Sequence, residues 1–101
     1  MTPPVKLSAK DAKRIILLIL EEGTIEVSFH CRSQRMQERG VTMVDLVEAL
    51  KNGEIKREPE WDEEQCNWKY RVEGEDTEGD ELIAITLIIE ADMELFIITV
   101  F

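Results

Sequence analysis

The stretch LIAITLIIEADMELFIITVF, residues 82–101, decides the fold. Its first part, Leu82 to Ile89, is almost continuously apolar and β-branched, which is typical of a strand covered on both faces. Ala91 and Asp92 then allow a turn into a second strand, Leu95 to Phe101. The end of the chain therefore predicts two consecutive strands.

More strands are expected before this stretch. Residues 68–72 alternate apolar and basic side chains, with Trp68, Tyr70 and Val72 on one side, which predicts a half-buried strand. Residues 54–61 predict an edge strand, because Pro59 has no amide donor and a central strand would tolerate it poorly. Between these strands and the final pair lies an acidic turn, residues 73–80. Alternation over residues 25–29 predicts one further strand.

The helices are expected in the first half of the chain. Ser8 and Asp11 resemble a capping box that starts a helix, which ends near Glu22 at Gly23. Its apolar run, residues 15–20, either lies in the core or contributes to a subunit contact, and we favour the core. A short helix is expected over residues 31–39, ended by Gly40. A third helix follows, with the apolar stripe of an amphipathic helix and a second capping pattern. That stripe and its cap comprise Thr42, Met43, Asp45, Leu46, Val47 and Leu50.

This order of elements predicts the fold class. A chain of 101 residues is one domain by length. Helices in the first half and strands in the second indicate an α+β domain, with the N-terminal helices packed on one face of a mainly antiparallel sheet. Residues 1–7, which include two consecutive prolines, are expected to form a flexible arm.

The charge is strongly acidic and unevenly distributed. The net charge is −10, with zero over residues 1–29, +2 over residues 30–57 and −12 over residues 58–101. An acidic protein repels nucleic acid at long range, which disfavours a groove that tracks phosphates along RNA but allows a small local anion site. The acidic half could instead bind a basic protein partner.

Several other classes of function find no support. No apolar run approaches the ~20 residues of a membrane span, and the N-terminus does not read as an export signal, so we expect a cytoplasmic protein. Cys31 and Cys66 are expected to be free thiols. His30, Cys31 and Cys66 lack the spacing of a zinc site. We therefore expect no metal and no cofactor.

The most suggestive local feature is a group of arginines in residues 30–40, HCRSQRMQERG. In a regular α-helix, Arg32, Arg35 and Arg39 would lie within about 60° of each other around the axis. Guanidinium groups on one face suit a phosphate or carboxylate. The alternative is that these side chains are solvated or paired with nearby acids, which needs no function to explain it.

His30 is the candidate acid–base residue beside these arginines. On the same regular helix it would point about 140° away from Arg35, so it joins the arginines only if the helix starts after it. Cys31, four residues before Arg35, would be aligned with them.

The order of residues in this region resembles a known family. The pattern is H-x4-R-M-x2-R-G-V, followed by TMVDLVEALKNGEI and, at the end of the chain, ITVF. It is similar to an uncharacterised family of small bacterial domains with the motif H-x3-R-M-x2-R-G-I, grouped with RelE/BrnT-like toxins of toxin–antitoxin systems. The resemblance covers residues 25–101 and leaves the helix at residues 8–23 as an addition.

The resemblance implies a compact sheet with helices alongside, a role related to RNA and an antitoxin as partner. Arg35, Met36, Arg39 and Gly40 match the motif directly. The family histidine falls on Cys31 by spacing, so either His30 or Cys31 fills that position. Met36 and Val41 are interpreted as core residues, and Gly40 as a residue with positive φ.

Two functional hypotheses remain. The first is a RelE/BrnT-like domain that binds RNA or another anion through Arg32, Arg35 and Arg39, with His30, Arg35 and Arg39 as candidate catalytic residues of a metal-independent ribonuclease. The second is a non-catalytic module that binds a protein through the acidic half. Self-association through the apolar first helix is a third expectation.

Overall fold

The stretch that decides the fold forms an antiparallel strand pair. In the computed structural model, which describes residues 3–101, β5 (Glu81–Ile89) pairs with β6 (Glu94–Val100), with Leu87 opposite Phe96. A short 3₁₀ turn, η2 (Glu90–Asp92), connects them. Both predicted strands are confirmed, and the turn falls where Ala91 and Asp92 indicated it.

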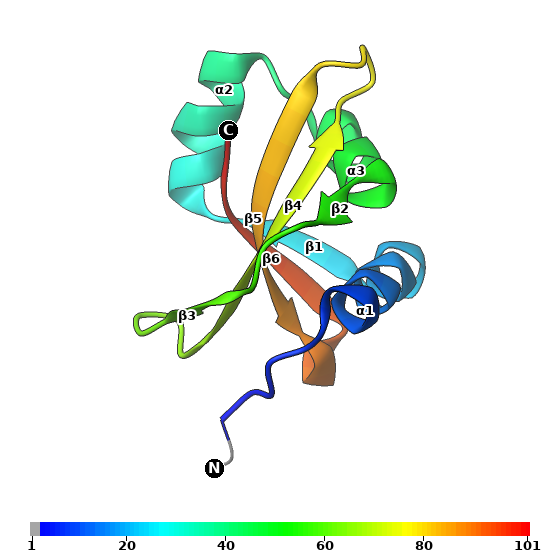
Figure 1. Cartoon of the computed structure of the whole chain (residues 1–101). Coiled ribbons are helices and arrows are strands. Elements are labelled where there is room, and N and C mark those ends of the chain that lie inside the picture. Colours follow the sequence, from blue (N-terminus) through cyan, green and yellow to red (C-terminus); the bar gives the residue numbers. More distant parts are fainter. Residues whose placement is uncertain (1–2) are drawn as a thin grey trace.

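The sheet has six strands and is mixed (Figure 1). Its order is β1 (Thr24–Val27), β6, β5, β4 (Asn67–Glu75) and β2 (Glu54–Ile55), and β3 (Glu60–Asp62) also pairs with β4. All pairs are antiparallel except β1 with β6, which is parallel. Alternation of side chains predicts that a segment is a strand but not its direction, so this exception could not be foreseen.

Two strand predictions need correction. The single edge strand expected over residues 54–61 is divided into β2 and β3, and the proline that cannot donate to a ladder, Pro59, lies between them. The strand expected over residues 25–29 ends at Val27. Phe29 begins a helical segment instead and is 77% exposed.

Both predicted helix caps are present. Ser8 accepts a hydrogen bond from the Asp11 amide at the start of α1 (Ala9–Glu22). Thr42 and Asp45 form a complete capping box at the start of α3 (Met43–Asn52). Between them lie the π-helical turn η1 (Cys31–Arg35) and the short helix α2 (Met36–Arg39). Gly40 ends α2 with φ of 65°, the positive value that the sequence predicted.

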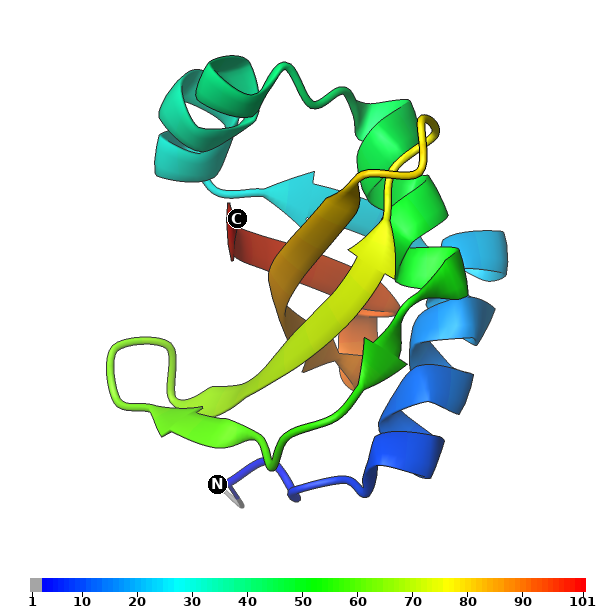
Figure 2. The same cartoon turned by 45° about the horizontal axis from the view of Figure 1, so that its top comes forward.

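The helices cover one face of the sheet, and the core lies between them (Figure 2). Alternate residues of β4 and β5 face it, among them Tyr70, Val72, Leu82 and Ala84. Gly74 permits close packing of α3, because a Cβ atom there would lie 2.2 Å from the Ala49 carbonyl oxygen. The prediction of a single α+β domain with helices on one face is confirmed.

The first helix belongs to the core, as its apolar run predicted. Ile16 and Ile19 are fully buried, whereas Leu17 and Leu18 are each 41% exposed. Lys13 ties α1 to the end of α3, since its ammonium donates to the carbonyl oxygens of Leu50, Lys51 and Gly53 at 2.6–2.9 Å. Burial lowers the pKa of Lys13, and the charge of Glu54 partly offsets this effect.

The N-terminal segment is bound to β4 along its described part. The Leu7 amide donates to the Tyr70 hydroxyl at 2.8 Å, and the Trp68 indole donates to the Pro4 carbonyl oxygen at 3.1 Å. The expectation of a flexible arm over residues 1–7 also includes Met1 and Thr2, which lie outside the described residues. Within residues 3–101, no helix has the length and apolarity needed to cross a membrane.

Candidate anion-binding site

The sequence-predicted residues lie on the surface helix formed by η1 and α2. Ser28 caps it, accepting from the Cys31 amide at 3.1 Å and donating to the Ile98 carbonyl oxygen of β6 at 2.7 Å. His30, Arg32, Arg35 and Arg39 are all exposed. The only hydrogen bond found for the four side chains, within residues 3–101, runs from Arg39 Nη2 to the Glu81 carbonyl oxygen at 2.9 Å.

The helix is not the regular α-helix that the sequence suggested. The Met36 amide donates to the carbonyl of Cys31, five residues back, so η1 is a π turn. In such a turn, residues five apart lie nearly above one another, which places Cys31 and Met36 together in the core. By the same geometry, His30 and Arg35, also five apart, are expected closer together around the axis than in a regular α-helix, and Arg32 further from Arg35 than about 60°. The spacing of about 60° between the three arginines was predicted for a regular α-helix, which this segment is not.

The π turn also separates the two candidates for the family histidine position. Cys31 is fully buried, and burial raises the pKa of its thiol. A buried, protonated thiol cannot act on a ligand at the surface. Of the two residues, only His30 presents its side chain to solvent, although no described contact joins it to an arginine.

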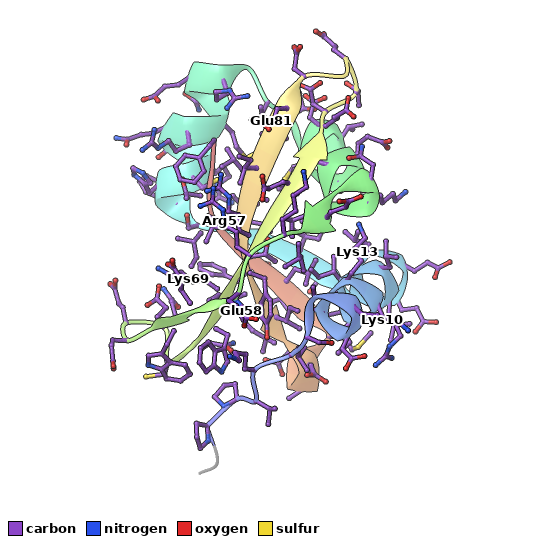
Figure 3. The ribbon with its side chains drawn as sticks, in the orientation of Figure 1. Lys10, Lys13, Arg57, Glu58, Lys69 and Glu81 are labelled. Carbon is purple, nitrogen blue, oxygen red and sulfur yellow. The ribbon has the colours of Figure 1, made fainter. Side chains whose placement is uncertain are left out.

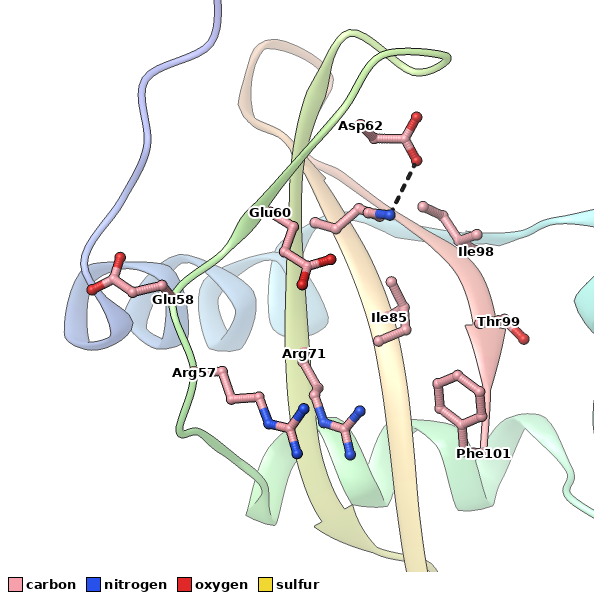
Figure 4. A pocket seen from close by; sticks show the side chains of 10 residues that line it. Arg57, Glu58, Glu60, Asp62, Arg71, Ile85, Ile98, Thr99 and Phe101 are labelled. Atoms are coloured by element: carbon pink, nitrogen blue, oxygen red, sulfur yellow. Dashed lines mark ion pairs between the residues drawn. The ribbon is translucent and has the colours of Figure 1, made fainter.

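A different set of cations lines a hollow on the open face of the sheet, which the helices leave uncovered (Figure 4). The hollow has a volume of about 330 Å³. Its walls come from β4, β5, β6 and the segment that contains β3. It is lined by Arg57, Glu58, Glu60, Asp62, Lys69, Arg71, Ile85, Ile98, Thr99 and Phe101. Figure 3 shows Arg57, Glu58 and Lys69 together on this side, away from Lys10 and Lys13 of α1.

Two arginines lie side by side in the hollow. Figure 4 shows the guanidinium groups of Arg57 and Arg71 next to each other and pointing the same way. Arg71 Nε is buried without a hydrogen-bond partner, because the nearest carboxylate oxygen, of Glu73, is 3.7 Å away. The guanidinium of Arg71 also lies 6.0 Å from the centre of the Phe101 ring. Adjacent like charges with an unused donor are apt for an anion.

A second buried polar atom in the hollow lacks a partner. The Thr99 hydroxyl oxygen of β6 makes no hydrogen bond with the described residues. Buried polar groups are almost always hydrogen-bonded, so each exception calls for an explanation. Both residues line the hollow, but Figure 4 shows the Thr99 hydroxyl directed away from the two guanidinium groups, so a ligand with acceptor oxygens beside the arginines would satisfy Arg71 alone.

The carboxylates around the hollow are engaged to different degrees. Asp62 pairs with Lys69 at 3.8 Å. Glu58 pairs with Lys6 of the N-terminal segment at 3.3 Å, and Figure 4 shows its carboxylate directed away from the arginines. Glu60 has no ion pair or hydrogen bond among residues 3–101. Arg71 has the long ion pair with Glu73 at 3.7 Å, and Arg57 has no ion pair among residues 3–101.

Sequence reasoning missed this site, although one signal pointed to it. The alternation that places Tyr70 and Val72 in the core puts Lys69 and Arg71 on the opposite face. Arg57 joins them because β2 and β3 pair with β4 one after the other, which places residue 57, between them, alongside β4. The register of β3 with β4 cannot be read from composition.

Comparison with known proteins identifies the type of domain but no activity. Residues 27–101 match a family described as a domain of unknown function, DUF4258. No curated protein and no solved structure matches the chain. The match agrees with the uncharacterised small domain that the motif suggested, whereas the grouping with RelE/BrnT-like toxins stays a resemblance.

Proposed function

We propose that this chain, which belongs to the DUF4258 family of domains of unknown function, is an RNA-binding domain that holds a phosphate group in the sheet hollow. The observation that carries the proposal is the pair Arg57 and Arg71, whose guanidinium groups lie next to each other in the hollow, with Arg71 Nε lacking a hydrogen-bond partner. Planar guanidinium groups bind phosphate oxygens through paired charge-assisted hydrogen bonds.

The resemblance to RelE/BrnT-like toxins implies a role related to RNA. We therefore propose that the phosphate held in the hollow belongs to an RNA strand. The net charge of −10 restricts binding to a local grip on a few phosphates, because the acidic surface repels the rest of a long strand. The surface helix lies beside the end of β6, near Phe101 (Figures 1 and 2). Arg32, Arg35 and Arg39 can therefore contact phosphates that follow the one in the hollow.

Cleavage is a separate part of the proposal, and it rests on His30. A metal-independent ribonuclease needs a base, an acid and a group that stabilises the phosphate. His30, Arg35 and Arg39 are the residues we propose for this chemistry, because the π turn is expected to bring His30 and Arg35 closer together around the axis than a regular α-helix would. They supply at most part of the required set.

Binding is tested with a short single-stranded RNA, by fluorescence anisotropy at two salt concentrations. Arg71→Gln should weaken binding by about 10- to 100-fold, because a hydrogen bond between charged groups contributes about 1.5–3 kcal/mol. Arg14→Gln is the matched control, since Arg14 is 69% exposed on α1 and makes only a local pair with Asp11. Equal affinity of the two variants would contradict the proposal.

Cleavage is tested by expression in bacteria. If the domain cleaves messenger RNA, expression should arrest growth, and His30→Ala or the double variant Arg35→Ala/Arg39→Ala should relieve the arrest. Full growth with intact RNA on expression of the unchanged protein would contradict cleavage while leaving binding open to the anisotropy test.

A second candidate function, a protein-interaction module, is favoured by the acidic end of the molecule. A hollow of about 420 Å³ there is lined by four glutamates and one lysine, Glu54, Glu73, Glu75, Glu81 and Lys56. We propose a basic segment, such as that of an antitoxin, as the partner. Co-purification with the protein of the neighbouring gene would support this partner, provided that the charge-reversing substitutions Glu75→Lys and Glu81→Lys abolish the co-purification.

Self-association is the third expectation. If Leu17 and Leu18 of α1 form a contact between two copies, light scattering should show a dimer.

A further inference from the structure

We infer that the sheet hollow accepts a single nucleotide and prefers guanine, with Glu60 as the residue that determines this specificity. The inference rests on the proposed function, because it places the phosphate of that nucleotide on Arg57 and Arg71. It adds Glu60, which lines the same hollow, as a second recognition element.

The size and floor of the hollow fit one nucleotide. Its volume of about 330 Å³ is near the lower end of small-molecule sites. The apolar floor is formed by Ile85, Ile98 and Phe101, whose ring is 43% exposed. Aromatic and aliphatic surfaces of this kind accept the flat face of a base, and an aromatic ring contributes about 1–3 kcal/mol per stacked base.

The charges of the hollow leave one carboxylate available to the ligand. Asp62 is occupied by Lys69, and Glu58 by Lys6. Glu60, on β3, has no such partner within residues 3–101. Figure 4 shows its side chain directed to the same part of the hollow as the two guanidinium groups. A ligand held by its phosphate therefore meets a free carboxylate close to the apolar floor.

A carboxylate selects among the bases by its chemistry. It has two acceptor oxygens and no donor. Guanine offers two adjacent donors on its Watson–Crick edge, N1–H and the N2 amino group, which match the two oxygens. Adenine, cytosine and uracil each present at least one acceptor next to their donor, and this acceptor would face the carboxylate unfavourably. Guanine is thus the base whose Watson–Crick edge offers a donor to each of the two oxygens of Glu60.

The experiment is a titration of the full chain with the four nucleoside 5′-monophosphates, followed by NMR shifts. Guanosine monophosphate should bind about 5- to 100-fold more tightly than the other three, the range expected for one bidentate pair. Glu60→Gln should remove this preference, because the amide replaces one acceptor by a donor. Glu63→Gln is the matched control, on the exposed turn after β3. Arg71→Gln should weaken all four nucleotides together.

The outcomes separate this inference from the proposed function. Equal binding of four nucleotides that is still weakened by Arg71→Gln would overturn the guanine preference and leave the anion site in place. A guanine preference that persists in Glu60→Gln would overturn the role of Glu60. If neither the nucleotides nor RNA bind in a manner that depends on Arg71, the proposed function fails as well.

Discussion

The two faces of the sheet are made by the same strands, yet they differ in what their side chains achieve. On the covered face, Tyr70, Val72 and Leu82 join a dry core with the helices. On the open face, the intervening residues include Arg71 and Thr99, and the Nε atom of the first and the hydroxyl of the second are buried without partners. Each strand therefore contributes to the core on one side and to the hollow on the other.

This difference between the two faces of the sheet indicates which face of a small domain is the better candidate for a binding site. A core satisfies its polar groups or has none, because an unpaired buried group costs about 1–3 kcal/mol. The unpartnered Nε of Arg71 is hard to explain by stability. It is readily explained by a ligand that supplies the missing acceptor.

The largest effect is expected from a cavity in the covered face. Leu46→Ala on α3 should lower the free energy of unfolding by about 2–5 kcal/mol, because Leu46 is fully buried. Val44→Ala on the same helix is the control, since Val44 is 69% exposed and should change stability by less than about 0.5 kcal/mol. Urea denaturation measures both. RNA affinity of the folded Leu46→Ala protein should be unchanged, and a loss of affinity would show that the faces are coupled.

An intermediate effect, of opposite sign on the two faces, is expected from replacing threonine by valine. Thr99→Val removes an unpartnered hydroxyl and should raise the free energy of unfolding by about 1 kcal/mol. Thr86→Val, on the covered face, removes a hydrogen bond to the Ala84 carbonyl oxygen and should lower the free energy of unfolding by about 0.5–1.5 kcal/mol. A loss of stability in Thr99→Val would mean that a bound water satisfies the hydroxyl in solution.

The smallest effect concerns Asp45 of α3, whose carboxylate accepts hydrogen bonds from Thr77 in the turn between β4 and β5. Hydrogen bonds from Thr77 and Thr42 lower the pKa of Asp45 to about 2 from an ordinary value of 3.8. The ionised form is therefore favoured by folding, and its contribution is present above pH 4 and is lost as the pH falls through 2. Thermal unfolding between pH 5 and pH 2 should show this loss in the unchanged protein. The Asp45→Asn variant should lack that part of the pH dependence. If stability changed with pH equally in the variant and the unchanged protein, Asp45 would not be the group responsible.

The fold could be predicted from local patterns wherever one residue type decides the structure. Ser8, Thr42 and Gly40 marked the helix ends because caps and positive φ have few alternatives. The direction of β1 and the division of the edge strand at Pro59 could not be predicted, since both depend on which distant strand is the partner.

The candidate site was harder to predict than the fold. The arginines of the surface helix attract attention because they are close in sequence, but closeness in sequence depends on a helix period that the π turn changes. Arg57 and Arg71 are fourteen positions apart and meet only through the pairing of β3 and β4. Their significance depends on partners that they lack, which is a property of the folded chain.

The π turn also determines which positions of this segment are committed to the interior. Cys31 and Met36, five residues apart, are both buried in the core, whereas the residues directly before them, His30 and Arg35, are exposed. Substitutions at His30 or Arg35 can therefore alter the surface of the domain without removing a core side chain.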